Sequence, residues 1–527
     1  MEVIALPLPV AKCPQVLVWS GVDDCVAAGT SDIHGLHVCQ YHGEDHLCFW
    51  KGRQKGIHGN GIGVIMNKHY EVAKTVRIPD SMATVDLHEF RLTSKETALV
   101  TTYFPRLHGP IWVLDSIFRE VDLKDGRVLF EWSALDHVDL FESHTPRGSY
   151  GALGDGLHNY NAWDYFHINS VDKNEAGDYL ISSRHTDCIL KVSGVDGSVI
   201  WRLNGDRSSF TITGFTFRRQ HHARFLQEAT NHTVISLFDN DNDGFTQKGP
   251  ASTGIIVEID HVSNVANKLL QLDGPTPTGL VTESMGSVSI LPDENIFVSW
   301  GADSAMAEYL PDGTPVWYAH VGWQSRNYRA YKANWVGQPL QPPALWTFAR
   351  SLDSPAVSYV SWNGATEVRR WRFYASGSEK GPYEVVGSIE KKDFETKFEH
   401  TLYWPWTFTE ALSVGNESLR NSTAIGTFVS DANVTDDCEL SDCSSSDHQS
   451  NSFQAQNREH AVATPEGSQG VFSPDPAAYH GLRSLWRYLE HFMAGLGMLA
   501  LVAAGSWFLC KPLKISVRYH RLNNSYI

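Results

Sequence analysis

The sequence DGSVIW at residues 196–201 recurs as DGTPVW at residues 312–317, and a longer version, DGRVLFEW, occupies residues 125–132. An Asp-Gly pair between strand-forming residues is typical of a tight β-hairpin, because glycine readily adopts the positive φ that such a turn needs. A β-rich run precedes each pair, at residues 111–115, 188–192 and 307–310. Apolar and polar residues alternate with a period of two up to about residue 430. The sequence therefore predicts an all-β protein.

A second unit, a strand followed by a turn and another strand, recurs along the same part of the chain. It occupies residues 87–103, 166–183, 220–238 and 286–300. Together with an Asp-Gly hairpin, such a unit makes a four-stranded sheet, and recurrence of four-stranded sheets is typical of a β-propeller. A β-sandwich with unrelated Asp-Gly turns is the alternative architecture.

Composition narrows the class of protein. The chain has 527 residues, of which 42% are hydrophobic and 20% charged, a globular composition. The length exceeds the roughly 250–300 residues at which a single core stops growing, so several domains are expected. The formal net charge is −17. We predict no nucleic-acid partner, because that would require a clustered excess of Lys and Arg.

We predict five segments. They are a β-propeller at 1–342, a small β module at 343–412, a polar disordered linker at 413–485, a transmembrane helix at 486–510 and a short basic tail at 511–527. The small module resembles an immunoglobulin or fibronectin type III sandwich, because residues 356–374 alternate cleanly and place Trp362 and Trp371 in a core.

The membrane prediction rests on the stretch from Phe492 to Cys510, which contains no charged residue and is long enough to cross a bilayer. A buried core helix is the alternative. Basic residues follow directly, and a basic flank belongs on the cytoplasmic side. We therefore expect a single-pass protein in which everything before this segment is lumenal or extracellular. The glycosylation sequons at Asn231, Asn416, Asn421 and Asn433 fit that side.

The N-terminus and the cysteines say less about targeting and fold. Residues 1–12 lack the basic region of a signal peptide, so we expect that the gene model starts late and omits the true start. No CxxC pair is present among eight cysteines, which disfavours zinc ribbons and thioredoxin-like sites. Cys25, Cys39 and Cys48 can supply one disulfide in an oxidising compartment, with the pairing left open.

Three histidines, His88, His167 and His221, fall at equivalent positions of the repeated unit. The first strand of each propeller blade lines the central channel, so these side chains should converge there. A single histidine is more often structural, but the repeat itself fixes these three positions. They could bind a metal such as zinc. Arg184 and Asn169 near His167 instead favour a pocket for an anion, because Arg, His and Asn are oxyanion donors. We therefore predict no metal.

Several motifs in chain order resemble the arylsulfotransferase family, and its fungal branch in particular. They are DYFHINSV at 164–171, SSRH at 182–185, the segment 194–201 and QHH at 220–222. Supporting stretches are LCFWKG at 47–52, SLFDN at 236–240 and YRAY at 328–331. The likeness covers residues 16 to 340, and the ordered set is far more specific than any one motif.

The resemblance implies a six-bladed propeller that moves a sulfuryl group from a phenolic sulfate ester to a phenol through a sulfated histidine, without a nucleotide donor. It places the nucleophile on His221, with His222 as the alternative one residue away. The supporting residues fall on His167, Asn169 and Arg184, and the family's earlier histidine falls on His88.

Chemical reasoning about the residues agrees with this carry-over. Neutral imidazole is a competent nucleophile near pH 7, and Arg184 is a fixed cation suited to the sulfuryl oxygens. His88 or His167 could protonate the departing phenolate as general acid. Trp163 and Tyr165 could stack on the aryl ring, with ordinary packing as the alternative.

We expect no cofactor for the reaction. The sequence has no Gly-rich phosphate loop and no Gly-X-Ser-X-Gly elbow, which disfavours nucleotide-dependent transferases and serine hydrolases. The acidic run Asp239–Asp243 suggests a structural calcium or a plain acidic turn. The alternative to an enzyme is a catalytically silent propeller that binds a ligand or glycan in an anion pocket.

Overall fold

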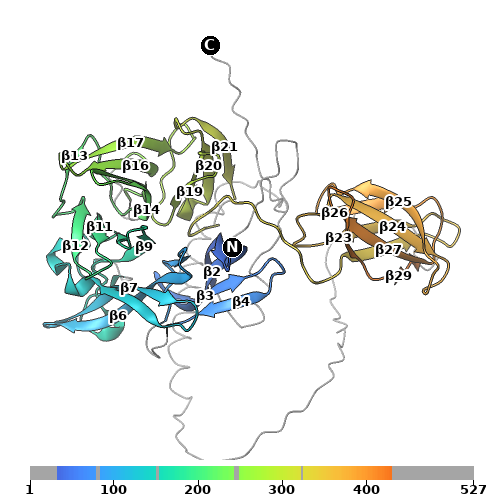
Figure 1. The fold of residues 1–527 in the computed structure, drawn as a ribbon, viewed down its shortest axis with the longest axis horizontal. Helices are drawn as coiled ribbons and strands as arrows, with labels where there is room; N and C mark the ends of the chain where they lie inside the picture. Colours follow the sequence, from blue (N-terminus) through green and yellow to red (C-terminus); the bar gives the residue numbers. More distant parts are fainter. Residues whose placement is uncertain (1–31, 79–83, 150–152, 243–248, 322–324, 430–527) are drawn as a thin grey trace, which may run out of the picture. The chain divides into compact units, whose positions relative to one another are not determined.

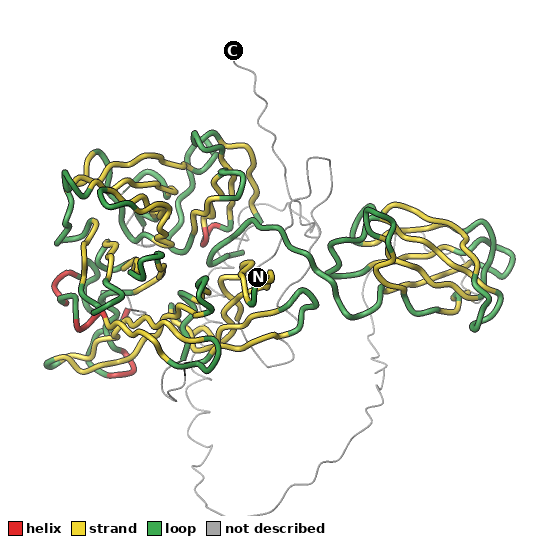
Figure 2. Tube along the Cα trace, viewed as in Figure 1, coloured by secondary structure: helices red, strands yellow, loops and turns green. Residues whose placement is uncertain are grey.

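The computed structural model describes residues 32–429, except 79–83, 150–152, 243–248 and 322–324. Strands and loops make up nearly all of this part, with a few short 3₁₀ turns (Figure 2). The longest of these turns, such as Ala134–Asp136, have three residues. The all-β prediction is confirmed.

The described residues between 32 and 320 form five sheets. The first is β1 (Asp32–Tyr41), β2 (Glu44–Lys55), β3 (His58–Met66) and β4 (Val72–Val76); the second is β5 (Phe90–Leu92), β6 (Thr97–His108), β7 (Ile111–Asp122) and β8 (Val128–Ser133). The third is β9 (Ile168–Lys173), β10 (Tyr179–Ser183), β11 (Cys188–Val192) and β12 (Val199–Leu203).

The fourth and fifth sheets complete this set. The fourth, in the order β13-β17-β16-β15-β14, contains β13 (Thr211–Thr213), β14 (His221–Glu228), β15 (His232–Asp239), β16 (Thr253–Asp260) and β17 (Val265–Asp273). The fifth contains β18 (Ser287–Ile290), β19 (Ile296–Trp300), β20 (Ala305–Tyr309) and β21 (Pro315–His320). The five sheets follow one another around a common centre, as a propeller requires (Figure 1). The number of six blades stays a prediction.

The Asp-Gly hairpins lie where the sequence predicts them. Gly126, Gly197 and Gly313 have φ values of 79°, 76° and 87° and precede β8, β12 and β21. The repeats also contact one another, because the indole N–H of Trp132 donates to the carbonyl oxygen of Gly197 at 3.0 Å. The tryptophan that ends one repeat thus fixes the turn of the next.

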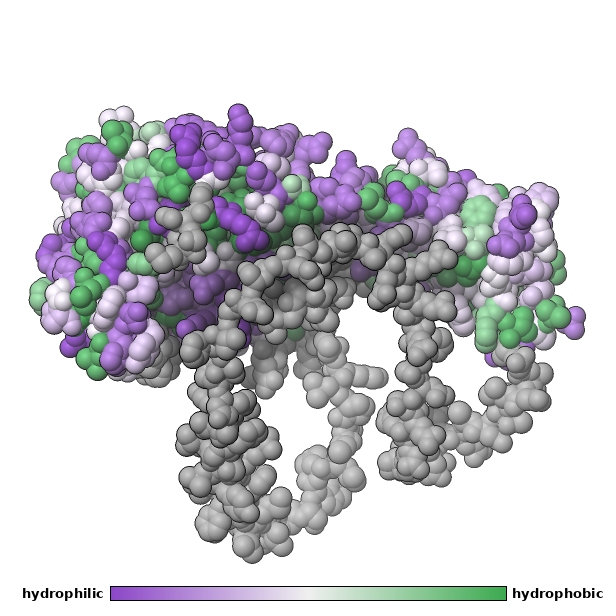
Figure 3. Space-filling view, turned by 90° about the horizontal axis from the view of Figure 1, so that it is seen from below, coloured by the Kyte–Doolittle hydropathy of each residue, from purple (hydrophilic) through white to green (hydrophobic). Residues whose placement is uncertain are grey.

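Neighbouring sheets are joined by apolar clusters. Trp132, Phe118 and Tyr179 lie in the cluster shared by the second and third sheets. Leu180, Ile235 and Val257 lie in the cluster shared by the third and fourth. Burial of such faces on both sides of a sheet explains why the strands are rich in aromatic and β-branched residues. On the molecular surface in Figure 3, hydrophobic residues are interspersed with hydrophilic ones.

Residues 344–429 form two further sheets. One, in the order β26-β23-β22-β30, contains β22 (Ala344–Ala349), β23 (Val357–Ser361), β26 (Glu395–Glu399) and β30 (Phe428–Val429). The other contains β24 (Arg370–Ser376), β25 (Glu384–Glu390), β27 (Trp406–Leu412), β28 (Ser418–Asn421) and β29 (Ile425–Gly426). Trp362 and Trp371 are buried in one core cluster with Val360 and Phe373.

The end of this module differs from the sequence prediction. Strands β28, β29 and β30 lie between residues 413 and 429 and pair with β27 and β22, so the sheets extend past residue 413, where the linker was predicted to begin. These strands have two to four residues each, too short to show a two-residue alternation.

Most residues of the membrane and glycosylation predictions cannot be compared with the structure, because they lie outside the described ranges. The transmembrane helix of residues 486–510, the tail 511–527, Cys25 and Asn433 lie outside the described residues. Within the described ranges, no helix is both long and apolar enough to cross a bilayer. Asn231, Asn416 and Asn421 are exposed, and their glycosylation stays a prediction.

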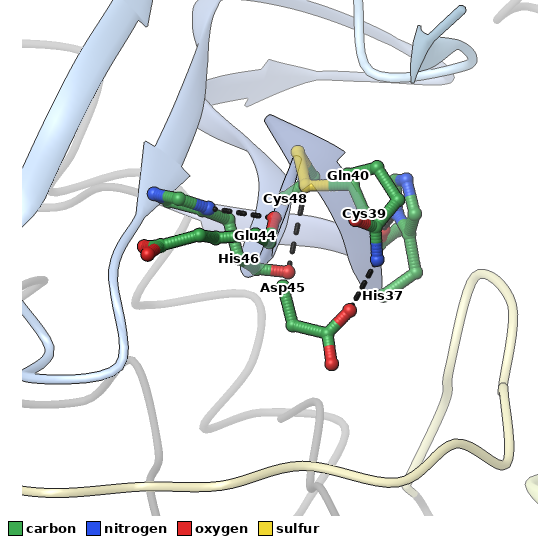
Figure 4. The surroundings of a disulfide bond; sticks show 8 residues. His37, Cys39, Gln40, Glu44, Asp45, His46 and Cys48 are labelled. Atoms are coloured by element: carbon green, nitrogen blue, oxygen red, sulfur yellow. Dashed lines mark hydrogen bonds between the residues drawn. A yellow bond between two sulfur atoms is a disulfide. The ribbon is translucent and has the colours of Figure 1, made fainter. Parts of the chain in front are cut away.

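A disulfide joins Cys39 on β1 to Cys48 on β2, and the two cysteines are nine residues apart in sequence (Figure 4). It resolves the pairing that the sequence left open. Cys188 is buried and free. Around the bridge, the Sγ of Cys39 contacts the carbonyl oxygen of His46 at 3.5 Å.

Reduction of this disulfide should lower the free energy of unfolding by about 2 to 3 kcal/mol, because the bridge restricts a short loop of the unfolded chain. Denaturation in guanidinium with and without dithiothreitol measures the effect. The double variant Cys39→Ala with Cys48→Ala serves as control and should not respond to the reductant. Equal midpoints for the oxidised and reduced wild-type protein would contradict the expectation.

Candidate active site

The three predicted histidines lie at the starts of edge strands of their sheets. His88 precedes β5, His167 precedes β9 and His221 opens β14. All three are at most 4% exposed. The rings of His88 and His167 are in edge contact, with centroids 4.5 Å apart. The ring of Tyr328 lies 5.7 Å from His88 and 6.5 Å from His221, so it stands between them. The structure therefore links the three histidines, His167 through its contact with His88, and His88 and His221 through Tyr328.

Two buried carboxylates orient two of these histidines. The Nδ1–H of His88 donates to Oδ1 of Asp86 at 2.5 Å, and that of His167 donates to Oδ2 of Asp164 at 2.6 Å. A hydrogen bond at Nδ1 fixes the ring and leaves Nε2 as the atom available to a ligand. Sequence reasoning overlooked both carboxylates, although the spacings Asp-X-His and Asp-X-X-His could have indicated them.

Burial sets the charge of these groups. Burial, only partly offset by Asp164, lowers the pKa of His167 to about 4. Burial alone would raise the pKa of Asp164, but the nearby His167 and His185 outweigh it and hold that pKa well below its usual range. At neutral pH the pair is therefore an imidazole and a carboxylate.

Both nitrogens of His221 are hydrogen-bonded, Nδ1 as a donor and Nε2 as an acceptor. Its Nδ1–H donates to Oδ1 of Asn240 at 2.6 Å. The amide of Asn240 donates to the carbonyl oxygens of Thr282 and Met285 at 3.2 and 3.0 Å, so Oδ1 must be the acceptor toward His221. The Nε2 lone pair meets only the Met285 N–H, at 3.3 Å. Burial, followed by the charge of Arg184, holds the pKa of His221 well below its usual value.

His222 is placed differently. Its Nδ1 accepts from the backbone N–H of Val288 at 3.3 Å, and its Nε2 lies 3.0 Å from the hydroxyl oxygen of Tyr331. Its φ of 56° turns it away from its neighbour. Each nitrogen of both rings thus has a hydrogen-bond partner, and the two histidines differ in their charged neighbours. Arg184 acts on His221, whereas Arg224 and Arg329 act on His222. His221 is therefore the one that shares the predicted arginine of the site.

Arg184 and Asn169 lie beside these rings. Two guanidinium N–H groups of Arg184 donate to the carbonyl oxygens of Arg219 and Glu283, both at 2.9 Å. The amide of Asn169 donates to the carbonyl oxygen of Gln220 at 2.6 Å. Its Oδ1 is buried and has no hydrogen-bond partner among the described residues. Both side chains are held by the backbone segment that leads into His221.

The predicted aryl-binding residues lie in the core instead. Trp163 and Tyr165 are buried in the cluster between the second and third sheets. Their polar atoms donate to the carbonyl oxygens of Thr145 and Val138 at 3.1 and 3.2 Å. The structure therefore favours the alternative of ordinary packing. An aromatic ring that does face the histidines is that of Tyr103, whose centroid lies 5.6 Å from His88 and 5.8 Å from His167.

The same side chains can be tested as a metal site. His58 joins them in two groups, with Asp86 and His88 and with Asp164 and His167. Donor atoms that share one tetrahedral zinc lie about 3.3 Å apart. The carboxylate and imidazole atoms here are 2.5 and 2.6 Å apart, which is a hydrogen-bond distance. The distances describe two hydrogen-bonded pairs, and the absence of a metal stays a prediction.

A buried ion cluster of Glu89, Arg224 and Arg329 holds the strands that carry the site. Arg224 and Arg329 contact the carboxylate of Glu89 at 2.7 and 2.6 Å. Arg329 also donates to the carbonyl oxygens of His88 and Asn169 at 2.8 and 2.7 Å. The cluster thus ties β5, β9 and β14 together near the histidines.

At the edge of the site, His144 links two acidic groups. Its Nδ1 lies 2.7 Å from Asp187 and its Nε2 3.0 Å from Asp206. Hydrogen bonding to Asp187, supported by Asp206 and reduced by partial burial, raises the pKa of His144 to about 9.

This raised pKa predicts how stability depends on pH. The ion pairs contribute fully below pH 6.5, the usual pKa of histidine, and the contribution is lost as pH rises through about 9. Chemical denaturation from pH 6 to 10 of wild type and His144→Gln measures it. Their difference in unfolding free energy should be largest at low pH and shrink toward high pH. A difference that grows with pH would show that His144 is not charged by these partners.

The acidic turn has one unusual carboxyl. Burial raises the pKa of Asp239 to about 8. Its Oδ1 accepts from the backbone N–H groups of Arg218 and Asp241 at 2.9 and 3.1 Å. Asp243 lies outside the described residues. A structural calcium at Asp239–Asp243 stays a prediction.

Comparison with known proteins finds one family whose model matches the chain. The family model for arylsulfotransferase (ASST) matches residues 37–322. A search of curated proteins finds no match. Among solved structures, virginiamycin B lyase from Staphylococcus aureus is 10% identical, with 72% of this chain and 91% of that chain covered and a TM-score of 0.27. A protein of unknown function from Bacteroides caccae is 12% identical, with 53% and 92% covered and a TM-score of 0.30. We draw no argument from similarities this low.

Proposed function

The chain belongs to the arylsulfotransferase family, and on that premise we propose that it transfers a sulfuryl group from a phenolic sulfate ester to a phenol through a sulfated His221. The observation that carries the proposal is the hydrogen bond from Nδ1 of His221 to Asn240, which fixes Nε2 as the unprotonated nitrogen. Substrate displaces the Met285 N–H, 3.3 Å from Nε2, when Nε2 acts as the nucleophile. No nucleotide donor takes part in this scheme.

In the first half-reaction, Nε2 of His221 forms a bond to sulfur and the bond from sulfur to the aryl oxygen breaks. The electron pair stays on the aryl oxygen, which takes a proton from His88 or His167 and leaves as a phenol. Because the free protein holds His167 neutral at pH 7, His167 takes this role only when the negative charge of the bound sulfate ester favours its protonated form. The ring of His221 gains positive charge in this step, and the carbonyl oxygen of Asn240 accepts the Nδ1–H that then becomes more acidic. The second half-reaction is the reverse, with a new phenol as nucleophile and the same histidine as base.

Positive charge on the protein stabilises the sulfuryl oxygens. Arg184 is the fixed cation whose charge acts on His221. Its guanidinium is held by two backbone carbonyls, so it is oriented before substrate binds. Asn169 contributes a neutral amide beside it. These roles follow from the position of each group and from the chemistry of sulfuryl transfer, which resembles phosphoryl transfer.

The same proposal includes the setting of the enzyme. A six-bladed propeller would carry the site, and residues 492–510 would attach the chain to a membrane with the site on the lumenal side. The disulfide between Cys39 and Cys48 supports an oxidising compartment. The exposure of Asn231, Asn416 and Asn421 is compatible with glycosylation there.

An assay of the full chain with nitrophenyl sulfate as donor and phenol as acceptor tests the proposal. We expect nitrophenol release that is accelerated by phenol, and phenyl sulfate as product by mass spectrometry. No nucleotide should be required. If protein with a cooperative unfolding transition releases no nitrophenol and forms no phenyl sulfate, the enzyme proposal fails and a binding role replaces it.

A further inference from the structure

His58 reaches the candidate active site from a different sheet than the histidines predicted from sequence. It is the first residue of β3, directly after the hairpin that follows β2. The next residue, Gly59, donates its backbone N–H to Oδ2 of Asp86 at 2.7 Å. A Cβ at Gly59 would lie 2.7 Å from the ring of Trp50, so only glycine allows β3 to come this close. The backbone therefore fixes His58 beside Asp86.

The imidazole of His58 lies between the two Asp–His pairs. Its Nε2 is 3.1 Å from Oδ2 of Asp164, and its Nδ1 is 4.0 Å from Oδ2 of Asp86. Its ring centroid is 5.7 Å from that of His88 and 5.4 Å from that of His167. Both of its nitrogen atoms are buried, and neither has an aligned hydrogen-bond partner among the described residues. His58 therefore contacts the two carboxylates at ion-pair distances but without the alignment of a hydrogen bond.

The two carboxylates lack any stronger cation. Within the part of the chain that the structure describes, Asp86 forms ion pairs only with His58 and His88. Asp164 forms them only with His58, His167 and His185. Neither meets a Lys or an Arg there. A buried carboxylate without a compensating positive charge is costly, so a proton is expected on one of these rings.

The surroundings point to His58 as the ring that holds this proton. Burial alone would lower its pKa, but contact with Asp164 and the charge of Asp86 outweigh burial and raise it. Burial instead lowers the pKa of His167 to about 4 and that of His185 well below its usual value. The other ring that packs on His58, that of Tyr103, stays protonated because burial raises its pKa well above the usual value.

We propose that His58 is a positioning residue that carries a proton at neutral pH and balances Asp86 and Asp164, which hold His88 and His167. In this role its positive charge also disfavours protonation of the neighbouring His167 ring. The role in turnover rests on the proposed sulfuryl transfer, whereas the protonation of His58 does not.

The sign of the effect follows from Coulomb's law. A cation near a second imidazole disfavours protonation of that imidazole, so loss of the cation raises its pKa. At ring separations of about 5.5 Å and an effective dielectric constant of about 20, the shift is about one to two pH units. One limb of the pH–rate profile reports the titration of the imidazole that exchanges a proton with substrate. His58→Gln should shift the midpoint of that limb to higher pH by that amount.

Two further variants sharpen this experiment. His58→Lys keeps a positive charge and should return the limb toward its wild-type position, which a merely structural role would not do. His400 is buried within the module of residues 344–429, where its ring contacts Ser358. His400→Gln should therefore leave the profile unchanged. A His58→Gln profile that coincides with wild type, or that moves to lower pH, would overturn the proposal.

A measurement without turnover keeps the two proposals apart. Protein labelled with ¹³C at the Cε1 of histidine reports the charge of each ring by NMR, and the signal missing from His58→Gln or His58→Lys is that of His58. We expect a charged ring at pH 7. A neutral His58 at pH 7 would overturn the proposal even if the enzyme is active. So would a stoichiometric transition metal that is present in wild type and lost in His58→Gln. A charged His58 in an inactive protein would instead contradict only the proposed function.

Discussion

Replacement of His221 by alanine is expected to reduce the rate of sulfuryl transfer by at least about 10³-fold, because the variant lacks the group that forms the covalent intermediate. The reason lies in the hydrogen bonds of the ring. Asn240 holds the Nδ1–H, and Nε2 meets only a backbone N–H at 3.3 Å. Initial rates of nitrophenol release at saturating phenol measure the loss.

The neighbouring histidine provides the matched control. His222→Gln should retain most of the transfer rate, because His222 lies near Arg224 and Arg329 and not near the Arg184 that acts on His221. If His222→Gln is as inactive as His221→Ala while both unfold like wild type, the nucleophile is His222. That result would mean a slip of one residue in the match to the family.

Glu89→Gln is expected to produce the largest loss of stability, about 3 to 5 kcal/mol, because it removes the carboxylate that neutralises two buried arginines. Glu89 is 1% exposed and contacts both Arg224 and Arg329. Burial alone would raise its pKa, but the two arginines lower that pKa to about 2. The carboxylate is therefore charged throughout the stable pH range. The denaturant midpoint at pH 7 measures the effect.

A surface pair serves as control for this measurement. Glu399 contacts Lys397 at 2.7 Å, and both side chains are at least half exposed. Glu399→Gln removes the same charge from solvent-exposed surroundings, where an ion pair adds little. It should leave the midpoint unchanged. Equal losses in the two variants would show that the buried ion cluster does not hold the strands together.

The sheets were predictable from sequence because their turns have a clear local signal. The Asp-Gly pairs at 125–126, 196–197 and 312–313 precede strands β8, β12 and β21, since glycine is needed where φ is positive. The C-terminal end of the module at residues 344–429 was not predictable in the same way. Strands β28 to β30 have two to four residues each, and they form by pairing with β27 and β22, a long-range effect.

The site was predictable only in part, and for a related reason. His88, His167 and His221 could be found because the repeat places them at matching strand starts. His58 and Asn240 could not, since they reach the site from other strands and only the fold brings them close. Trp163 and Tyr165 precede His167 in sequence, but their side chains enter the core between sheets. Nearness in sequence does not give the direction of a side chain.

The central claim is a covalent sulfuryl group on His221, and peptide mass spectrometry tests it most directly. The full chain would be mixed with nitrophenyl sulfate without acceptor, quenched at alkaline pH and digested. We predict a peptide that contains residues 220–224 with the added mass of one sulfuryl group, fragment ions that place it on His221, and its disappearance after phenol is added. Nitrophenol release with no sulfuryl group on this peptide, or with the group on another residue, would contradict the mechanism.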